Sequence, residues 1–572
     1  MPISCTVYAR SLQGVTGGQL SRFLASALGL ESSSDRRAVW ANKRPGDRNA
    51  KLRFADDLHE EQLGVLLRGE LRFKEELVKC ELNEGGREES LEKKQKKNSS
   101  LSIEQLVLPW LPVPYPQQLL DKQRVVKEAL DAALSGIRKS AKSRNYSPLP
   151  TWGNLQIDET TPCLVPAYRN KCEFSFGLNA EGEPDLGFVL ARATASAEPV
   201  VAAGESLWHI PHAIACIVGS LRTLLRMHIT EFPLFSHISK SGCWRICMVR
   251  VCPNSQESQV LVQSGALNEF QESRWEGILL EWANLVGVSS VYVQYNRSVT
   301  DTIVLSELHT MKLVVGKPVL SMKLGQEKIS GGVTFSVNPL SFFQTNSTGC
   351  ELLFGKVFDS IPIFAEEQLV LFDVCCGVGA IGQYLSKRWE TGGHRCEVVG
   401  VDIVEEAVAD AAVNAKNNAL SCTYVAGRAE QVLSGLIAQR QREEGRVSAT
   451  TITTTTTTTS TSTTTSTTFH TKVHPTKTRF VCVVDPPRSG LHKSVISAIR
   501  DCERISQVVY VSCNPNSLAE DLVRFCEPLT SSPAEEGVAV SQRFVPLRAG
   551  AVDMFPHTPH CEVVVVLNRT AA

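Results

Sequence analysis

The chain has 572 residues, of which 43% are hydrophobic and 21% are charged, and its formal net charge is -1. Two to four domains are therefore expected, and any basic surface for nucleic acid must be local. No apolar run reaches the roughly 18 residues that span a membrane, and the 18 irregularly spaced cysteines without a C-x-x-C pair argue against a zinc ribbon or a secreted disulfide framework.

Residues 1–85 are predicted to form the first domain. Their apolar pattern gives the order strand–helix–strand–strand–helix–strand, with helices at 16–30 and 60–71. This order resembles an RNA recognition motif (RRM), and the first domain is therefore expected to be ferredoxin-like or RRM-like. Only Tyr8 and Phe54 match the stacking aromatics, so a ferredoxin-like module that binds protein, or nothing, is an equal alternative.

A charged, polar segment follows and predicts a linker over residues 86–104. Residues 105–340 mix helices with alternating strands and predict a central α+β domain that binds RNA. In "YRNKCEFSFG" (168–177), the residues Cys172, Phe174 and Phe176 share one strand face.

Residues 341–572 change to strand–helix alternation and predict the catalytic domain. "QLVLFDVCCG", "CEVVGVDI", "RFVCVVDPP" and "QVVYVSC" are near-continuous apolar runs, which are typical of parallel strands buried on both faces. The prediction is a doubly wound, Rossmann-like α/β sheet with ligands beyond the carboxyl ends of its strands. A Thr-rich stretch, 450–468, cannot form a core and is predicted to be a disordered insertion.

The first candidate site is the turn after the first of these strands. "FDVCCGVGAIG" contains Gly377, Gly379 and Gly382 in a G-x-G-x-x-G pattern, and Asp402 ends the next strand. Such a turn lets the backbone approach a ligand, and the acid can accept two ribose hydroxyls. The pattern alone leaves a dinucleotide, S-adenosylmethionine and a purely structural turn as alternatives; Asp373 before the turn favours the methyl donor.

The second candidate site is "VVDPPRSGLH", which also follows a strand. Asp485 can bind the donor or a polar substrate edge, and Arg488 can orient a carboxylate or phosphate. Class I methyltransferases that act on exocyclic amines usually place an aromatic residue after the prolines. Arg488 stands there, which makes amine methylation less favoured.

Cysteine chemistry supplies the third candidate site. A thiolate that adds to C6 of uracil raises the electron density at C5, which can then attack a sulfonium methyl, and a base must remove the C5 proton. Cys513 ends the strand after Asp485 and is the candidate nucleophile. "DMFPHTPHCEVVVVL" offers Glu562 or His560 as the base.

Seven ordered motifs together resemble the RNA uracil-5-methyltransferases, in particular the eukaryotic tRNA branch with an N-terminal RNA-recognition-like domain. The resemblance covers about residues 105–570 and is carried by "YRNKCEFSFG", "NPLSFFQTN", "FDVCCGVGAIG", "VVGVDIVEEAV", "DPPRSGL", "VSCNPNSLAEDL" and "FPHTPHCEVVVVL".

The resemblance implies a class I S-adenosylmethionine-dependent methyltransferase that makes 5-methyluridine in tRNA, at the T-loop uridine. It implies Cys513 as nucleophile and Glu562 as base. It also implies contacts to the donor and to the substrate; the donor contacts are Gln344, Cys375, Gly377, Asp402 and Asp485, and the substrate contacts are Arg169 and Arg488. Many relatives have an aromatic residue where this chain has Cys375, so that contact is expected through the backbone. No metal is expected.

Two other functions remain open from the residues. An RNA cytosine-5-methyltransferase also uses cysteine, but with Pro-Cys and Thr-Cys signatures that differ from "SCNP" here. An RNA-binding folding factor for tRNA is the alternative of a different class. The expected partner is tRNA without a membrane, the expected state is a monomer, and the expected compartment is cytoplasm or nucleus, with the mitochondrion as alternative.

Overall fold

A computed structural model describes residues 4–8, 39–42, 49–54, 72–73, 76–77, 79–82, 102–144, 152–193, 197–255, 257–298, 300–303, 309–325, 332–364, 367–449, 477–527 and 543–570. The chain divides into two compact units, Met1–Ser100 and Leu101–Ala572. The predicted helices at 16–30 and 60–71 and the Thr-rich stretch 450–468 lie outside the described residues.

The first unit contains a four-stranded antiparallel sheet in the order β2-β3-β1-β6. Its strands are β1 (Ser4–Tyr8), β2 (Val39–Asn42), β3 (Asn49–Phe54) and β6 (Lys79–Leu82), with the two-residue strands β4 (Arg72–Phe73) and β5 (Glu76–Leu77) paired beside them. β1 and β3, the first and third strands of this sheet in chain order, lie at its centre, as the predicted ferredoxin-like order requires.

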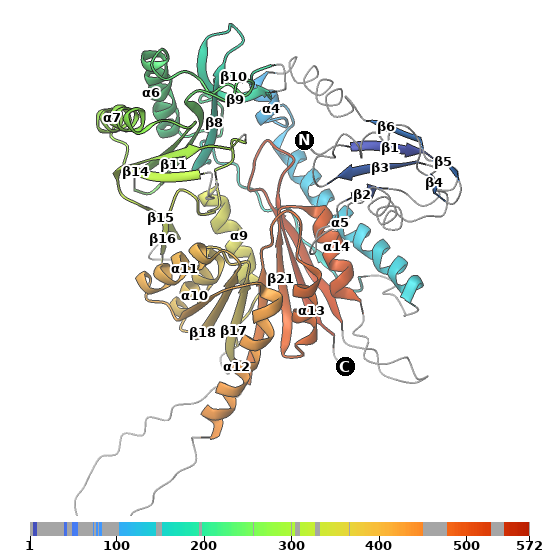
Figure 1. Cartoon of the computed structure of the whole chain (residues 1–572). Helices are drawn as coiled ribbons and strands as arrows, with labels where there is room; N and C mark the ends of the chain where they lie inside the picture. Colours follow the sequence, from blue (N-terminus) through green and yellow to red (C-terminus); the bar gives the residue numbers. More distant parts are fainter. Residues whose placement is uncertain are drawn as a thin grey trace, which may run out of the picture. The chain divides into compact units, whose positions relative to one another are not determined.

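The second unit contains two large sheets, of which the first belongs to the central region (Figure 1). Its order is β10-β9-β8-β11-β12-β13-β14. The elements are β8 (Lys171–Leu178), β9 (Pro184–Ala191), β10 (Val200–Ala202), α6 (His212–His228), β11 (Trp244–Val251), β12 (Ser258–Ser264), α7 (Glu269–Val286), β13 (Ser290–Asn296) and β14 (His309–Gly316). Cys172, Phe174 and Phe176 lie buried in one core with α6 and α7, which confirms the predicted strand face.

The other sheet has eight strands in the order β19-β18-β17-β20-β21-β23-β22-β7. Its strands are β7 (Gln156–Ile157), β17 (Glu367–Val374), β18 (Cys396–Asp402), β19 (Cys422–Ala426), β20 (Lys477–Val484), β21 (Ile505–Ser512), β22 (Phe544–Val552) and β23 (Glu562–Arg569). The five strands from β19 to β21 are parallel, and β23 runs antiparallel between β21 and β22.

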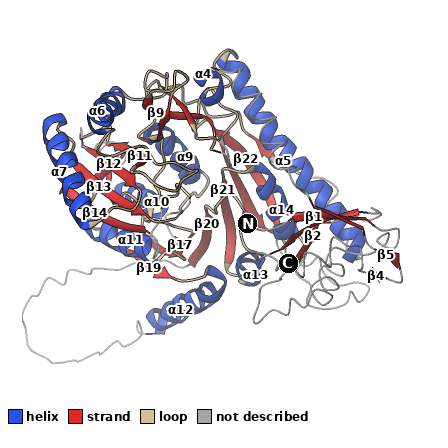
Figure 2. Cartoon of the chain, turned by 45° about the horizontal axis from the view of Figure 1, so that its top comes forward, coloured by secondary structure: helices blue, strands red, loops and turns tan. Residues whose placement is uncertain are grey.

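Helices cover both faces of this sheet, which makes it doubly wound as predicted (Figure 2). They are α9 (Ser347–Asp359), α10 (Ala380–Thr391), α11 (Glu405–Asn417), α12 (Ala429–Ala449), α13 (Lys493–Asp501) and α14 (Pro515–Cys526). A short ribbon of β15 (Leu320–Leu324) and β16 (Val333–Val337) precedes α9.

An additional long helix, α5 (Tyr115–Arg144), packs on the eight-stranded sheet through α14 and β22. Its residues Val126, Leu130, Ala133 and Ile137 recur at helical spacing and are buried in the core of that sheet. The approach to α14 is close, because a Cβ added at Gly136 would lie 2.5 Å from Val523. The predicted boundary at residue 340 assigned this helix to the central domain, whereas its packing joins it to the catalytic sheet.

The short helix α4 (Ile103–Val107) precedes α5. Within the ranges given above, no helix is both long and apolar enough to cross a bilayer.

Candidate active site

A cavity of about 1780 Å³ lies at the carboxyl ends of the parallel strands and reaches the central region. The nine residues predicted from the sequence all line it; they are Arg169, Gln344, Cys375, Gly377, Asp402, Asp485, Arg488, Cys513 and Glu562. Parallel strands of one sheet end at the same edge, so residues far apart in the chain meet there.

The turn after β17 forms one wall of the cavity. Cys375, Gly377 and Gly379 all have positive φ, at 63°, 53° and 76°. Asp402 supports the turn, because its Oδ2 accepts the N–H of Gly377 at 2.9 Å and its Oδ1 accepts the N–H of Val404 at 2.9 Å. The glycine turn and the predicted acid therefore form one rigid structure, in which each carboxylate oxygen keeps a free acceptor position.

Asp373 lies behind this wall rather than in the cavity. It is fully buried, and its Oδ2 accepts the N–H of Gly382 at 3.0 Å, while its Oδ1 has no hydrogen-bond partner. Burial raises the pKa of Asp373 to about 7, and the charge of Asp402 adds to the shift. Asp373 thus ties the turn to the start of α10 and does not itself reach a ligand.

The composition of this wall fits a methyl donor that carries a sulfonium cation. The acidic side chains that line the cavity here are Asp402, Glu406, Glu430 and Asp485. Ile403 also lines it and is 65% exposed, which offers an apolar surface for a flat base. Carboxylates beside a cation favour binding, whereas a dinucleotide would bring a negatively charged pyrophosphate toward the same acids.

Asp485 and Arg488 form the turn after β20. Burial raises the pKa of Asp485 to about 7, and the charge of Asp373 adds to the shift. Arg488 is exposed, and its carbonyl oxygen accepts a hydrogen bond from Asn514 Nδ2 at 2.7 Å. Asn514 follows Cys513 directly, so this bond fixes the Asp485–Arg488 turn against the turn of the candidate nucleophile.

Cys513 leaves β21 in a tight turn before α14. Ser512 Oγ accepts the N–H of Asn514 at 3.1 Å and donates to the carbonyl oxygen of the same residue at 3.0 Å. Asn514 is the N-cap of α14, and Pro515 is its first residue, a position where proline is favoured. The thiol of Cys513 is thereby held at the strand end and in the cavity.

Glu562 lies across from Cys513. Ser512 of β21 pairs with Val563 of β23, so Cys513 and Glu562 are the next residues outward on the two antiparallel strands. Residues opposite each other on such strands have Cα atoms about 4.5–5.5 Å apart. The antiparallel insertion of β23 thus brings the two predicted catalytic residues to one point.

Burial dominates the electrostatics of this pair. Glu562 is 5% exposed, and burial raises its pKa to about 8; Asp485 adds to the shift and Arg488 opposes it. Burial also raises the pKa of the Cys513 thiol, with Glu562 and Asp485 adding and Arg488 opposing. His560 lines the cavity as well, is exposed, and has its pKa lowered by burial and by Arg488.

Gln344 and Arg169 meet where the central region joins the catalytic sheet. Asn170 Nδ2 donates to the carbonyl oxygen of Gln344 at 3.0 Å, and the N–H of Asn170 donates to the carbonyl oxygen of Thr345 at 2.8 Å. Arg169 forms a β-bridge with Asn346. The "YRNK" and "FFQTN" segments are therefore one local structure.

Sequence reasoning missed Arg250, which supports the cavity from the central sheet. The side chain is buried; its Nη1 donates to Asn338 O at 2.7 Å and its Nη2 donates to Ser341 O at 2.8 Å. Asn338 and Ser341 both line the cavity ahead of Gln344. In the sequence, Arg250 is simply a charge within an apolar strand, and only its unexpected position in a buried run could have drawn attention to it.

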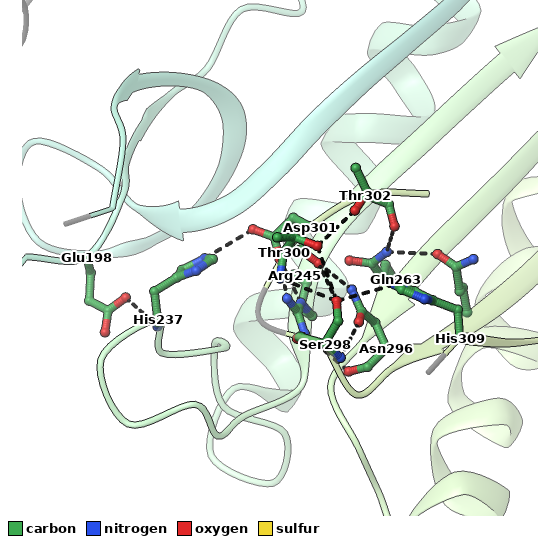
Figure 3. A network of polar contacts seen from close by, with 11 residues as sticks. Glu198, His237, Arg245, Gln263, Asn296, Ser298, Thr300, Asp301, Thr302 and His309 are labelled. Carbon is green, nitrogen blue, oxygen red and sulfur yellow. Dashed lines mark hydrogen bonds and ion pairs between the residues drawn. The ribbon is translucent and has the colours of Figure 1, made fainter. Parts of the chain in front are cut away.

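A second missed contribution is the loop after β13, which brings Ile303 to the cavity. Figure 3 shows the polar network that holds this loop, in which Arg245 Nε donates to Asp301 Oδ1 at 2.7 Å. His237 Nε2 lies 3.2 Å from the other carboxylate oxygen, Asp301 Oδ2. The guanidinium of Arg245 stacks 3.8 Å from the ring centroid of Phe235, so the loop is anchored on the central sheet.

Comparisons with known proteins cover the parts of the chain that form this site. Residues 472–570 match the family tRNA (Uracil-5-)-methyltransferase, and residues 371–442 match the family Methyltransferase domain. The match at 472–570 contains Asp485, Arg488, Cys513 and Glu562. Among solved structures, the Pyrococcus abyssi tRNA (uracil-54, C5)-methyltransferase in complex with S-adenosyl-L-homocysteine shares the fold, with a TM-score of 0.51, 19% identity and coverage of 87% of this chain and 91% of that chain.

Curated relatives extend the comparison beyond the catalytic domain. The "tRNA (uracil-5-)-methyltransferase homolog A" of Mus musculus is 28% identical, with coverage of 82% of this chain and 69% of the relative. The Homo sapiens homolog A is 27% identical, with coverage of 82% and 67%. The "Zinc finger CCCH domain-containing protein 24" of Arabidopsis thaliana is 27% identical, with coverage of 84% and 70%.

The likeness to the solved structure establishes a class I methyltransferase fold, and the relatives agree over the central and catalytic regions together. Taken with the matched catalytic segment, they show that this chain is similar to the tRNA (uracil-5-)-methyltransferases over its central and catalytic regions.

Proposed function

We propose that this chain transfers a methyl group from S-adenosylmethionine to C5 of a uridine in tRNA, through a covalent bond between Cys513 and C6 of the uracil. The observation that carries the proposal is the position of Cys513 opposite Glu562, in a cavity that also holds the glycine turn and Asp402. A thiol and a base face to face beside a donor site are the groups that methylation of a pyrimidine carbon requires.

In the first step, the Cys513 thiolate adds to C6 of uracil. The C5=C6 electron pair moves to C5 and the C4 carbonyl, which gives an enolate. Burial raises the pKa of the thiol in the cavity, and the positive charge of Arg488 opposes that shift and so favours the thiolate. A substrate phosphate beside Arg488 would neutralise its charge and so weaken its effect on the pKa of Cys513. We therefore favour a role for Arg488 in orienting the uracil oxygens.

In the second step, C5 of the enolate takes the methyl group. When bound, S-adenosylmethionine supplies an electrophilic methyl on a sulfonium sulfur. Asp402, Asp485, Gln344 and the turn at Gly377 line the cavity and would hold this donor, and the electron pair of the broken S–CH3 bond would stay on its sulfur, which gives S-adenosylhomocysteine.

In the third step, the Glu562 carboxylate removes the C5 proton. The C5–H electron pair re-forms the C5=C6 double bond while the C6–S bond breaks, and its pair returns to Cys513 as thiolate. Because the pKa of Glu562 is about 8, this step should accelerate as pH rises through that value.

The tRNA is proposed to enter from the central region, where Arg169 lines the cavity, with the T-loop uridine as target. A guanidinium at this position suits the phosphate beside an extruded nucleotide.

The experiment uses an unmodified tRNA transcript, labelled donor and nucleoside mapping, and the expected product is 5-methyluridine. A transcript that contains 5-fluorouridine should trap the enzyme, because fluorine at C5 cannot leave as a cation. The trapped complex appears as a shifted band on a denaturing gel.

Two variants assign the roles. Cys513→Ala should form neither product nor adduct, whereas Glu562→Gln should accumulate an adduct with ordinary tRNA. Cys561→Ala is the matched control, because Cys561 also lines the cavity but lies beside the base. Formation of 5-methylcytidine alone, or an adduct with Cys513→Ala, would overturn the proposal.

A further inference from the structure

The loop 553–561, called here the base loop, carries Glu562 into the cavity. It joins β22 to β23, and its residues Phe555, Thr558, His560 and Cys561 line the cavity together with Glu562. His557 within it has φ 65°, a conformation that a residue with a side chain adopts only when its surroundings enforce it. The base loop therefore depends on contacts from outside itself.

The first contact is a buried ion pair with α5. Lys122 and Asp553 are both fully buried, and Lys122 Nζ contacts Asp553 Oδ1 directly. Lys122 Nζ also donates to the carbonyl oxygen of Phe555 at 3.1 Å, and the N–H of Phe555 donates to Asp553 Oδ1 at 3.2 Å. The first residues of the base loop are thus fixed to one point on α5.

The second contact fixes the middle of the base loop through Gln118, one turn earlier on α5. Its Oε1 accepts the N–H of His557 at 3.0 Å, and its Nε2 donates to Trp110 O at 2.9 Å. The N–H of Trp110 in turn donates to the carbonyl oxygen of His557 at 2.9 Å. The N–H and the carbonyl oxygen of His557 are therefore both held by hydrogen bonds. The ring of Trp208 also packs edge-on against the ring of His557, with the two ring centroids 4.6 Å apart.

A third contact extends the support to the end of the base loop. Thr558 Oγ1 donates to Phe555 O at 2.8 Å and accepts the N–H of His560 at 3.2 Å. Hydrogen bonds therefore connect Lys122, through Phe555 and Thr558, to His560, which lies two residues before Glu562.

None of Gln118, Lys122 and Asp553 lines the cavity, so none can touch the substrate. Proton transfer nevertheless requires the carboxylate of Glu562 within about 3 Å of the group that it deprotonates, and displacement by about 1 Å can lower a rate a hundredfold. Since the base loop leads directly into Glu562, its anchoring decides where that carboxylate lies.

We propose that Lys122 and Gln118 are positioning residues for Glu562: they hold the base loop so that the carboxylate meets the C5 proton of the methylated adduct. The inference rests on the proposed function. The step concerned breaks the C5–H and C6–S bonds, re-forms C5=C6, places the proton on Glu562 and returns the sulfur electron pair to Cys513. Addition at C6 and methyl transfer precede this step and do not need Glu562.

Gln118→Leu tests the proposal, because it keeps the approximate size of the side chain and removes its hydrogen bonds to Trp110 and His557. With ordinary tRNA, turnover should fall at least tenfold and a covalent adduct should accumulate, as with Glu562→Gln. With 5-fluorouridine tRNA, adduct formation per active site should stay within twofold of wild type, because trapping does not use the base.

The double variant Lys122→Met, Asp553→Leu is a second test that removes both charges together. Replacing a buried ion pair by apolar residues of similar size is often tolerated by the fold, whereas removing one partner leaves a buried charge. This variant too should lose turnover with ordinary tRNA and keep adduct formation with 5-fluorouridine tRNA. Counting donor sites by calorimetric titration with S-adenosylhomocysteine corrects both assays for protein that has not folded.

The control is Gln117→Leu, the same change one position earlier on α5. Gln117 is exposed, and its side chain donates to Asp121 Oδ1 within the same helix, at 3.2 Å. This variant should behave as wild type in both assays. A further check adds Gln118→Leu to Glu562→Gln; if Gln118 acts through Glu562, the residual release rate should fall no further.

Three outcomes would overturn the inference: wild-type turnover by both test variants, equal losses in the two tRNA assays, or additive losses in the combined variant. Equal losses would mean that the buried cluster supports the whole site rather than the base. Failure of the proposed function is distinct, because the wild-type enzyme would then form neither 5-methyluridine nor an adduct with fluorinated tRNA.

Discussion

Glu562→Gln should stabilise the fold at alkaline pH, although it impairs the reaction. The pKa of Glu562 is about 8 in the folded chain, against an ordinary value of 4.5, because the carboxyl is buried. Between these two values the folded state binds more protons than the unfolded state. The free energy of unfolding therefore falls as pH rises through this window, because the carboxyl ionises freely in the unfolded chain while burial keeps it protonated in the folded chain.

The size of the effect follows from the two pKa values. A single carboxyl with pKa 4.5 unfolded and about 8 folded lowers the free energy of unfolding by about 2.5 kcal/mol from about pH 6 to about pH 8.5. Glutamine resembles the protonated acid at every pH, so Glu562→Gln removes this loss. The variant should therefore gain about 2.5 kcal/mol relative to wild type over the same interval.

Urea denaturation of both proteins at the two pH values measures the gain, followed by the fluorescence of the buried Trp244 and Trp275 and by circular dichroism. Glu520→Gln is the control, because Glu520 is exposed on α14 and its solvation should change little on unfolding. If the difference between Glu562→Gln and wild type is the same at both pH values, the carboxyl is ionised in the folded chain at neutral pH and the buried-acid reasoning is refuted.

Three further predictions concern binding. Asp402→Ala should weaken S-adenosylhomocysteine binding more than tenfold in calorimetric titration, since charge-assisted hydrogen bonds contribute about 1.5–3 kcal/mol each; unchanged affinity, or tight binding of NADH, would place the ribose contact elsewhere. Arg250→Met should weaken binding of S-adenosylhomocysteine. Arg250→Lys keeps one hydrogen-bond donor for the 338–341 segment, so its affinity should fall less. Equal losses of affinity would exclude the hydrogen bonds to Asn338 and Ser341 as the cause. Deleting residues 450–468 should leave donor affinity and melting temperature nearly unchanged, because a Thr/Ser tract buries no apolar surface, and a clear loss of stability would contradict this.

The catalytic sheet and its site could be predicted because their signals are local. Apolar runs that end in polar residues mark strand ends, and the carboxyl ends of parallel strands converge. Asp402, Asp485 and Cys513 each follow such a run, so their convergence follows from the sheet alone. Glu562 begins a strand instead, and its place opposite Cys513 required the antiparallel orientation of β23, which the pattern of apolar residues does not encode.

The supporting residues could not be predicted, because their partners are distant in the chain. Lys122 lies in an amphipathic helix where lysine normally faces solvent, and Arg250 lies in a strand that gives no sign of its contact with the 338–341 segment. The assignment of α5 to the central domain followed from its place in the sequence. Its packing depends instead on Gly136, whose missing side chain admits Val523 of α14.

The anchoring of the base loop by α5 has a consequence for how activity arises during folding. Lys122 and Asp553 are separated by 431 positions, so their contact closes a very long loop and forms late relative to local structure. The donor wall, built from Cys375, Gly377 and Asp402, involves strands that are neighbours in the sequence as well as in the sheet. We therefore expect the donor wall to form before the base loop is docked, so that completion of the last strand and docking of α5 are the final step that makes the chain able to turn over.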